Sequence, residues 1–190
     1  MKKVLVFFLS CFFLASSAVA AQKVGDVTLS DEIKLEGDTL VLNGAGIRKK
    51  AVFKLYVGAL YLKAKSQDAK AIIAANDKMS MQIHITSGMI TKEKLLEAIT
   101  DGFRDATGGN TAPLQERMDQ LNKLFTAEIK KGDVIELAYA PAKGVLVSHN
   151  GKNLGSIAGL DFKQSLFAIW LGDKPSDKAL RSALLAETKK

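Results

Sequence analysis

Residues 42–62 read LNGAGIRKKAVFKLYVGALYL. Aliphatic, β-branched and aromatic residues dominate the second half, from Val52 to Leu62, and this pattern predicts a long strand. The Gly44-Ala45-Gly46 triplet does not match a dinucleotide-binding fingerprint, because Lys49 stands where the third glycine belongs and the following residues continue as strand. We therefore expect the two glycines to form a tight bend or bulge that delivers Arg48 to the start of the long strand.

The segments around this stretch alternate between strand and helix patterns in blocks. Upstream, short apolar runs from Val24 onward are broken by turn signals at Gly25, Glu36-Gly37-Asp38 and Asn43-Gly44. Downstream we expect a helix over 66–76 that follows a serine cap, a strand over 79–86, helices over 91–107 and 113–131, strands over 134–139, 144–149 and 152–157, and helices over 161–171 and 176–188. Because the helices are inserted as blocks, the order favours an α+β fold with a mostly antiparallel sheet over a parallel one.

The first 20 residues predict a secretion signal. Lys2-Lys3 precede an apolar run, Val4 to Leu14, which ends in the A-x-A pattern Ala18-Val19-Ala20. The run has about 11 residues, fewer than the ~20 that a helix needs to cross a bilayer. We expect cleavage before Ala21, a single domain over residues 21–190 without a transmembrane segment, and a periplasmic location, with secretion as the alternative.

Composition excludes several classes of protein. The 190 residues are 47% hydrophobic and 25% charged, which is typical of one folded globular domain. Signal cleavage would remove the single cysteine, Cys11, and two lysines, so the formal net charge falls from +7 to +5. The remaining lysines are spread along the chain, and we expect no nucleic-acid partner. With two histidines, His84 and His149, no remaining thiol, no P-loop and no G-x-S-x-G elbow, we expect neither a metal nor a cofactor.

The segment Gly44 to Arg48, with the Tyr61-Leu62 pair downstream, resembles the chalcone isomerase-like family, in particular its exported bacterial members. The later helices, the hairpin at Gly151 and the closing segment extend the resemblance over roughly residues 23–186. The resemblance implies an open-faced β-sandwich, in which helices cover one face of a large antiparallel sheet and a ligand cleft lies between them. The family holds true isomerases, which close a chalcone into a flavanone, and relatives that lack this activity and bind fatty acids or have no known ligand.

The catalytic set of the true isomerases is incomplete in this chain. The chain resembles them at Arg48, the arginine thought to polarise the substrate carbonyl, but Tyr56 stands where they have a threonine. Their catalytic tyrosine and asparagine, and a later hydroxyl residue, correspond to positions near these residues: Thr91, Ala98 and Lys163. No tyrosine occurs between Tyr61 and Tyr139. The chain therefore lacks the phenol and the amide that would organise water and stabilise an enolate, and such donors are each worth about 2.7–4 kcal/mol in a preorganised site. We predict no catalytic residue and no chalcone isomerase activity.

Arg48 and Tyr56 resemble the carboxylate-holding pair of the fatty-acid-binding relatives. A guanidinium offers a fixed fork of donors to a carboxylate, and a neutral phenol adds one more hydrogen bond. In a regular strand their eight-residue separation, at ~3.3 Å per residue, would be about 26 Å, so the pair requires a turn or bulge within residues 49–52. The alternative roles are a salt bridge from Arg48 to a nearby carboxylate such as Glu36 or Asp38, and core packing of Tyr56 with its hydroxyl at the rim.

These observations predict an exported, non-catalytic protein that binds a fatty acid or similar amphipathic carboxylate. Arg48 would hold the head group with help from Tyr56, and apolar residues would line the tail cavity. Two alternatives stay open. One is an isomerase or lyase acting on another enone or acid, with a rebuilt donor set: Arg48, Lys54, Tyr56 and Lys163. The other is an envelope interaction module whose cleft is filled by its own side chains.

Overall fold

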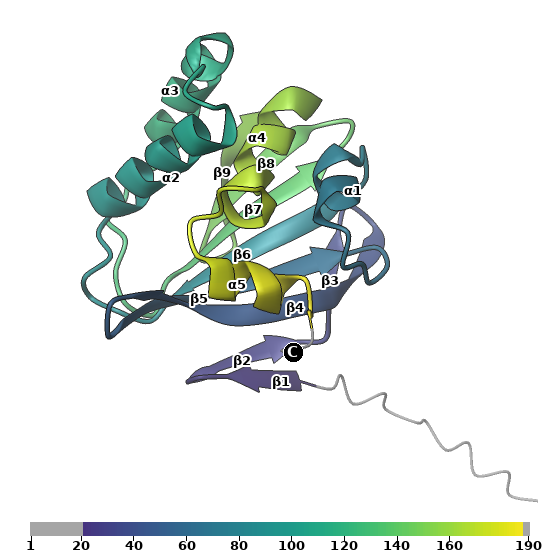
Figure 1. Ribbon diagram of the computed structural model, residues 1–190, viewed down its shortest axis with the longest axis vertical. Helices are drawn as coiled ribbons and strands as arrows, with labels where there is room; N and C mark the ends of the chain where they lie inside the picture. Colours follow the sequence, from purple (N-terminus) through teal and green to yellow (C-terminus); the bar gives the residue numbers. More distant parts are fainter. Residues whose placement is uncertain (1–20, 188–190) are drawn as a thin grey trace, which may run out of the picture.

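The computed structural model describes residues 21–187, and the signal predicted over residues 1–20 lies outside them. Its main feature is a seven-stranded antiparallel sheet (Figure 1). Each strand pairs with the strands that come before and after it in the sequence. The strands of this sheet, in order, are β3 (Glu32–Leu35), β4 (Asp38–Lys50), β5 (Phe53–Leu62), β6 (Met79–Ile85), β7 (Val134–Ala140), β8 (Gly144–His149) and β9 (Lys152–Ile157).

Helices cover one face of this sheet (Figure 1). They are α1 (Ala69–Ala74), α2 (Lys92–Ala106), the 3-10 turn η1 (Ala112–Leu114), α3 (Gln115–Leu124), α4 (Leu160–Leu171) and α5 (Lys178–Leu184). The larger core lies between the helices and the sheet, where side chains such as Ile83, Phe103 and Phe162 are fully buried. The prediction of an α+β fold with a large antiparallel sheet under a helical layer is confirmed.

A small two-stranded sheet, β1 (Ala21–Val24) and β2 (Val27–Ser30), packs against the opposite face over β4 and β5. Leu29 of β2 packs in a second apolar cluster with alternate residues of β4 and β5, such as Leu42 and Val57. Because side chains alternate along a strand, β4 and β5 contribute one set of residues to this cluster and the other set to the helical side.

Of the predicted tight bend or bulge at Gly44-Ala45-Gly46, the bend is wrong and the bulge agrees with a register shift next to Gly44, while the turn predicted at Asn43-Gly44 is wrong. Strand β4 runs through this segment with only a register shift between Leu42 and Gly44, and the chain reverses later, at Ala51-Val52. The glycines serve contact with a helix instead. A Cβ on Gly44 would lie 2.2 Å from the Ala183 carbonyl oxygen, so only a residue without a side chain lets α5 lie directly on β4.

Three helices are shorter than their sequence patterns predict. Helix α1 begins after Asp68, whose carboxylate caps it, and not after a serine. Helix α5 begins after Asp177 and ends at Leu184. Helix α3 ends at Leu124, although Phe125 and Ile129 continue its apolar spacing and are buried. Phe125 has left the helical conformation (ψ 85°), so irregular backbone delivers both side chains to the core.

No helix within residues 21–187 is both long enough and apolar enough to cross a bilayer.

Candidate functional site

The β4–β5 hairpin places Arg48 directly opposite Tyr56. The two residues are partners in the antiparallel register, with a register shift between Arg48 and Lys49 just before the turn. Side chains of directly opposed residues leave the same face of a sheet, with Cβ atoms about 4.5–5.5 Å apart. The reversal at Ala51-Val52 is therefore the turn within residues 49–52 that brings Arg48 and Tyr56 together. Both side chains lie on the helical side of the sheet.

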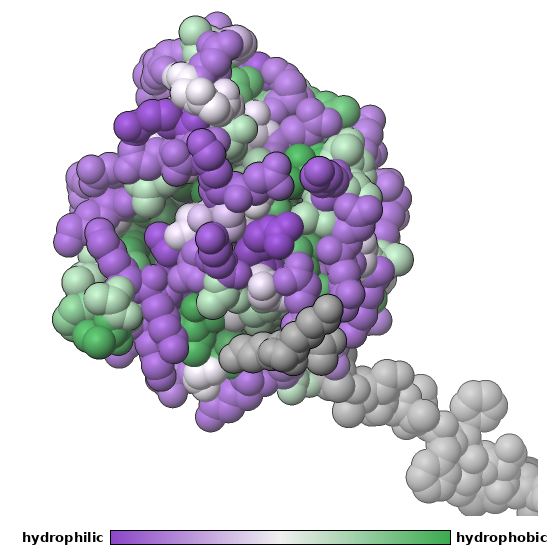
Figure 2. Space-filling view, viewed as in Figure 1, coloured by the Kyte–Doolittle hydropathy of each residue, from purple (hydrophilic) through white to green (hydrophobic). Residues whose placement is uncertain are grey.

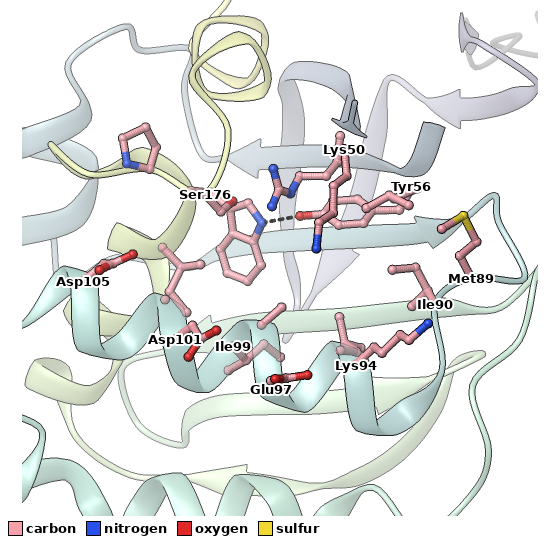
Figure 3. Close-up of a pocket in the computed structure, with 18 of the residues that line it drawn as sticks. Lys50, Tyr56, Met89, Ile90, Lys94, Glu97, Ile99, Asp101, Asp105 and Ser176 are labelled. Atoms are coloured by element: carbon pink, nitrogen blue, oxygen red, sulfur yellow. Dashed lines mark hydrogen bonds between the residues drawn. The ribbon is translucent and has the colours of Figure 1, made fainter. Parts of the chain in front are cut away.

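A cavity of about 500 Å³ lies over this pair. It is lined by residues of β4, β5, α2, α4 and the segment before α5 (Figure 3). Its wall carries buried aliphatic side chains, including Leu55, Leu95 and Ile99. Charged side chains of both signs line it from exposed positions: Lys50, Lys94, Lys174, Glu97, Asp101 and Asp105. The volume falls within the ~300–1,000 Å³ that is usual for pockets that bind small molecules.

Arg48 forms its ion pair with a residue that the sequence pattern did not suggest. Its Nη1 lies 3.5 Å from Oδ2 of Asp177, the residue that caps α5. The alternative role, a salt bridge to a nearby carboxylate, is therefore present, but the suggested partners are wrong. Both of those carboxylates pair with lysines: Lys143 for Glu36, and Lys78 and Lys63 for Asp38.

The carboxylate of Asp177 accepts its shorter hydrogen bonds from backbone N–H groups. Its Oδ1 accepts a hydrogen bond from the Leu180 N–H at 2.9 Å, and its Oδ2 accepts one from the Lys49 N–H at 3.3 Å. Burial acts to raise the pKa of this carboxyl, but these hydrogen bonds and the Arg48 charge hold it below its usual value. Among the described residues the guanidinium has only the one long contact, so most of its five N–H donors remain available.

The hydroxyl of Tyr56 is buried and accepts a hydrogen bond from Nε1 of Trp170 at 3.0 Å (Figure 3). Burial raises the pKa of Tyr56, so the phenol stays neutral at physiological pH and keeps its own proton to donate. The Oγ of Ser176, another cavity residue, is buried without a hydrogen-bond partner in the described part of the chain. Arg48, Tyr56 and Ser176 thus bring polar groups to one side of the cavity.

Sequence reasoning missed Trp170, Ser176 and Asp177. Trp170 is the only tryptophan of the chain, and a tryptophan in an otherwise apolar helix signals an N–H that needs an acceptor. Asp177 carried the usual signal of a helix cap, but a cap gives no indication of which strand the helix will cover.

Of the rebuilt donor set proposed for a different isomerase or lyase, Arg48 and Tyr56 meet at the cavity and the two lysines do not. Lys163 lies outside the cavity lining, where its Nζ is fully buried and donates to three carbonyl oxygens near the end of α1. Lys54 is exposed on β5 and does not line the cavity. Of the positions that correspond to the family's catalytic residues, Ala98 lines the cavity with a methyl group and Thr91 caps α2.

Within residues 21–187, no three histidine, cysteine, aspartate or glutamate side chains gather closely enough to hold a metal ion.

Comparisons with known proteins agree with this architecture. The sequence profile described as chalcone isomerase-like matches residues 21–186. Fatty-acid-binding protein 1 of Arabidopsis thaliana is 22% identical in an alignment 205 positions long, which covers 85% of this chain and 72% of that protein. A crystal structure of an Arabidopsis thaliana fatty-acid-binding protein shares the fold, with a TM-score of 0.68 and 19% identity over 84% of this chain and 92% of that chain. The chain therefore belongs to the chalcone isomerase-like family.

Proposed function

We propose that this protein binds a fatty acid or a similar amphipathic carboxylate in the cavity between the sheet and the helices, without catalysing a reaction. The observation that carries the proposal is the arginine, Arg48, which lies opposite Tyr56 at the cavity with most of its donors unused. The Arabidopsis thaliana relative that matches at low identity, by sequence and by fold, is named a fatty-acid-binding protein, which supports the same ligand class.

The geometry supports separate binding of a head and a tail. A carboxylate that reaches Arg48 would meet charge-assisted donors, with the Tyr56 and Ser176 hydroxyls beside it. An alkyl chain would contact the aliphatic wall, where each buried methylene contributes about 0.8 kcal/mol. A long chain therefore offsets association costs of ~4–15 kcal/mol, whereas a short one does not.

The tyrosines support a binding role without catalysis. All three tyrosines of the chain lie within the described residues, and of these only Tyr56 lines the cavity. Tyr61 donates to the Ser30 carbonyl on the other face of the sheet, and Tyr139 donates to Asn76. The α2 side of the cavity therefore carries no phenol that would organise water or stabilise an enolate.

We also propose that the protein is exported and acts in the periplasm. The support is the order of residues at the N-terminus: two lysines, an apolar run and the A-x-A pattern that ends at Ala20.

The head-group site is tested by Arg48→Ala. We expect affinity for a long-chain fatty acid to fall by roughly 10- to 100-fold, because hydrogen bonds to a charged group are worth about 1.5–3 kcal/mol. Isothermal titration of the purified protein measures this affinity, and thermal unfolding checks that the fold is retained. The control is Arg104→Ala, which removes the same charge from an exposed position on α2 outside the cavity lining. Equal affinities of the Arg48→Ala variant and the unmodified protein would refute the head-group assignment.

The contribution of the Tyr56 hydroxyl is tested by Tyr56→Phe. This change removes one donor for the carboxylate, so we expect affinity to fall by a factor of roughly 2 to 10, as one net hydrogen bond predicts. The matched control is Tyr61→Phe, which removes the same atom from a tyrosine on the other face of the sheet. If both substitutions change the affinity equally, the Tyr56 hydroxyl has no direct role at the head group.

A further inference from the structure

The tip of the β4–β5 hairpin exposes apolar side chains to solvent. Val52 is 85% exposed and Phe53 is 53% exposed, and Met89, in the segment after β6, is 43% exposed. These three are the large hydrophobic side chains that the described residues leave exposed. Figure 2 shows apolar surface gathered at the lower left, where Figure 1 places this hairpin tip.

The three residues belong to one end of the molecule. The Thr86 N–H donates to the Leu55 carbonyl at 3.1 Å, so the chain that leaves β6 toward Met89 continues beside the start of β5. Single exposed apolar residues are ordinary on a protein surface, but a grouped set marks a site of interaction. We call Val52, Phe53 and Met89 the apolar tip.

Lysines flank the apolar tip on the hairpin. Lys49 and Lys54 are exposed partners in the register, and Lys50 lies opposite Phe53. The chain carries no acidic residue between Asp38 and Asp68, so the hairpin presents these lysines without a neighbouring carboxylate of its own. An apolar tip flanked by lysines matches the interface of an anionic bilayer, where apolar groups enter the acyl boundary and ammonium groups remain at the head groups.

The apolar tip also adjoins the cavity. Lys50 and Met89, which belong to this end of the molecule, line the cavity together with Ile90 and Lys94 (Figure 3). An amphipathic ligand that leaves a bilayer at this position would reach the cavity without crossing bulk water.

We propose that the apolar tip and its flanking lysines form a docking surface for anionic phospholipid membranes. Val52 and Phe53 enter the interface, Lys49 and Lys54 contact the anionic head groups, and the cavity opens toward the lipid. Only the purpose of docking, transfer of a fatty acid, rests on the proposed function; docking itself is independent of the ligand.

The test is co-flotation of the protein with vesicles of phosphatidylcholine that contain phosphatidylglycerol, with no fatty acid added. The chain beginning at Ala21 is used, because it contains every described element and lacks the apolar run of residues 4–14. We expect Val52→Ser with Phe53→Ser to lower the bound fraction by roughly tenfold or more, since interfacial binding scales with buried apolar area. We expect Lys49→Gln with Lys54→Gln to lower it as well, and added salt to weaken binding of the unmodified protein.

The matched control for charge is Lys65→Gln with Lys70→Gln, two exposed lysines that follow the other end of β5. We expect this variant to float with vesicles as the unmodified protein does. Equal binding by the Val52/Phe53 variant, or equal binding to vesicles of phosphatidylcholine alone, would overturn the proposal. Failure of the unmodified protein to bind either vesicle would also overturn it.

Two further measurements separate this proposal from the ligand proposal. Arg48→Ala should float with vesicles normally even though it binds fatty acid weakly, because Arg48 lies in the cavity and not on the tip. The Val52/Phe53 variant should retain fatty-acid affinity in titration, because neither residue lines the cavity.

Discussion

Replacing Lys163 with methionine is expected to lower the free energy of unfolding by about 3 kcal/mol. The ammonium group donates to the carbonyl oxygens of Ile72, Ile73 and Ala75 at 2.9, 2.8 and 2.7 Å. These carbonyls lie at the C-terminal end of α1, where a helix leaves acceptors without partners of its own. Methionine fills a similar volume but leaves all three acceptors without this donor. The loss of three charge-assisted bonds exceeds the desolvation cost that is removed with the charge.

The protonation state supports this expectation. Burial lowers the pKa of Lys163 to about 8, so the ammonium form still predominates at neutral pH. Its three N–H donors then match the three acceptors, and the aromatic rings of Tyr139 and Phe167 lie 5.5 and 5.7 Å from Nζ.

Urea unfolding at pH 7, followed by far-ultraviolet circular dichroism, measures the effect. Lys65→Met is the control, because this exposed lysine lies outside the core and its replacement should change stability by less than about 0.5 kcal/mol. We expect Lys163→Met to keep its fatty-acid affinity at temperatures where it is folded, since Lys163 does not line the cavity. Unchanged stability would show that the end of α1 does not depend on this lysine.

Gly44→Ala is expected to destabilise the protein by about 3 kcal/mol, near the upper end of the usual range for overpacking. A Cβ at this position would lie 2.2 Å from the Ala183 carbonyl oxygen and 2.6 Å from that of Leu184. Both atoms belong to the backbone at the end of α5, so the helix has to move as a unit. Asp177 caps this helix and contacts Arg48, and we therefore expect fatty-acid affinity to fall together with stability.

Thermal and urea unfolding measure the first effect, and fatty-acid titration measures the second. Gly88→Ala is the matched control, because its Cβ would have no neighbour within 4 Å and its backbone does not require glycine. We expect this control to change stability by less than about 1 kcal/mol and to leave ligand affinity unchanged. A Gly44→Ala protein with normal stability would show that β4 and α5 are not in direct contact in solution.

Local pattern was sufficient for much of the sheet. The alternation of Met79, Met81, Ile83 and Ile85 predicted a strand with one buried face, and all four side chains are buried in β6. Between the strands predicted over 144–149 and 152–157, Asn150-Gly151 is the pair typical of a two-residue hairpin turn, and both residues adopt the positive φ values that such a turn requires. These features depend on a few neighbouring residues, so the sequence contains the whole signal.

Prediction from local sequence failed where the same residue type is compatible with two different structures. Glycines at positions 44 and 46 are typical of a bend, but in the folded protein they permit contact with α5, more than 130 residues later in the chain. Apolar spacing through Phe125 and Ile129 is typical of a continued helix, but irregular backbone also carries both side chains into the core. In each case the residue has its place in the packed interior, but its backbone does not adopt the bend or helix that the local sequence pattern favours.

The sequence by itself determined the fold class, the family resemblance and the identity of Arg48 and Tyr56 as candidate ligand contacts. Only the tertiary structure decided that the two residues lie opposite each other, because the reversal at Ala51-Val52 carries none of the usual glycine or proline turn signals. It also decided their partners: Asp177 is 129 residues from Arg48, and Trp170 is 114 residues from Tyr56. Local propensity sets the backbone angles of each segment, whereas contacts over such distances depend on which surfaces bury each other when the whole chain folds.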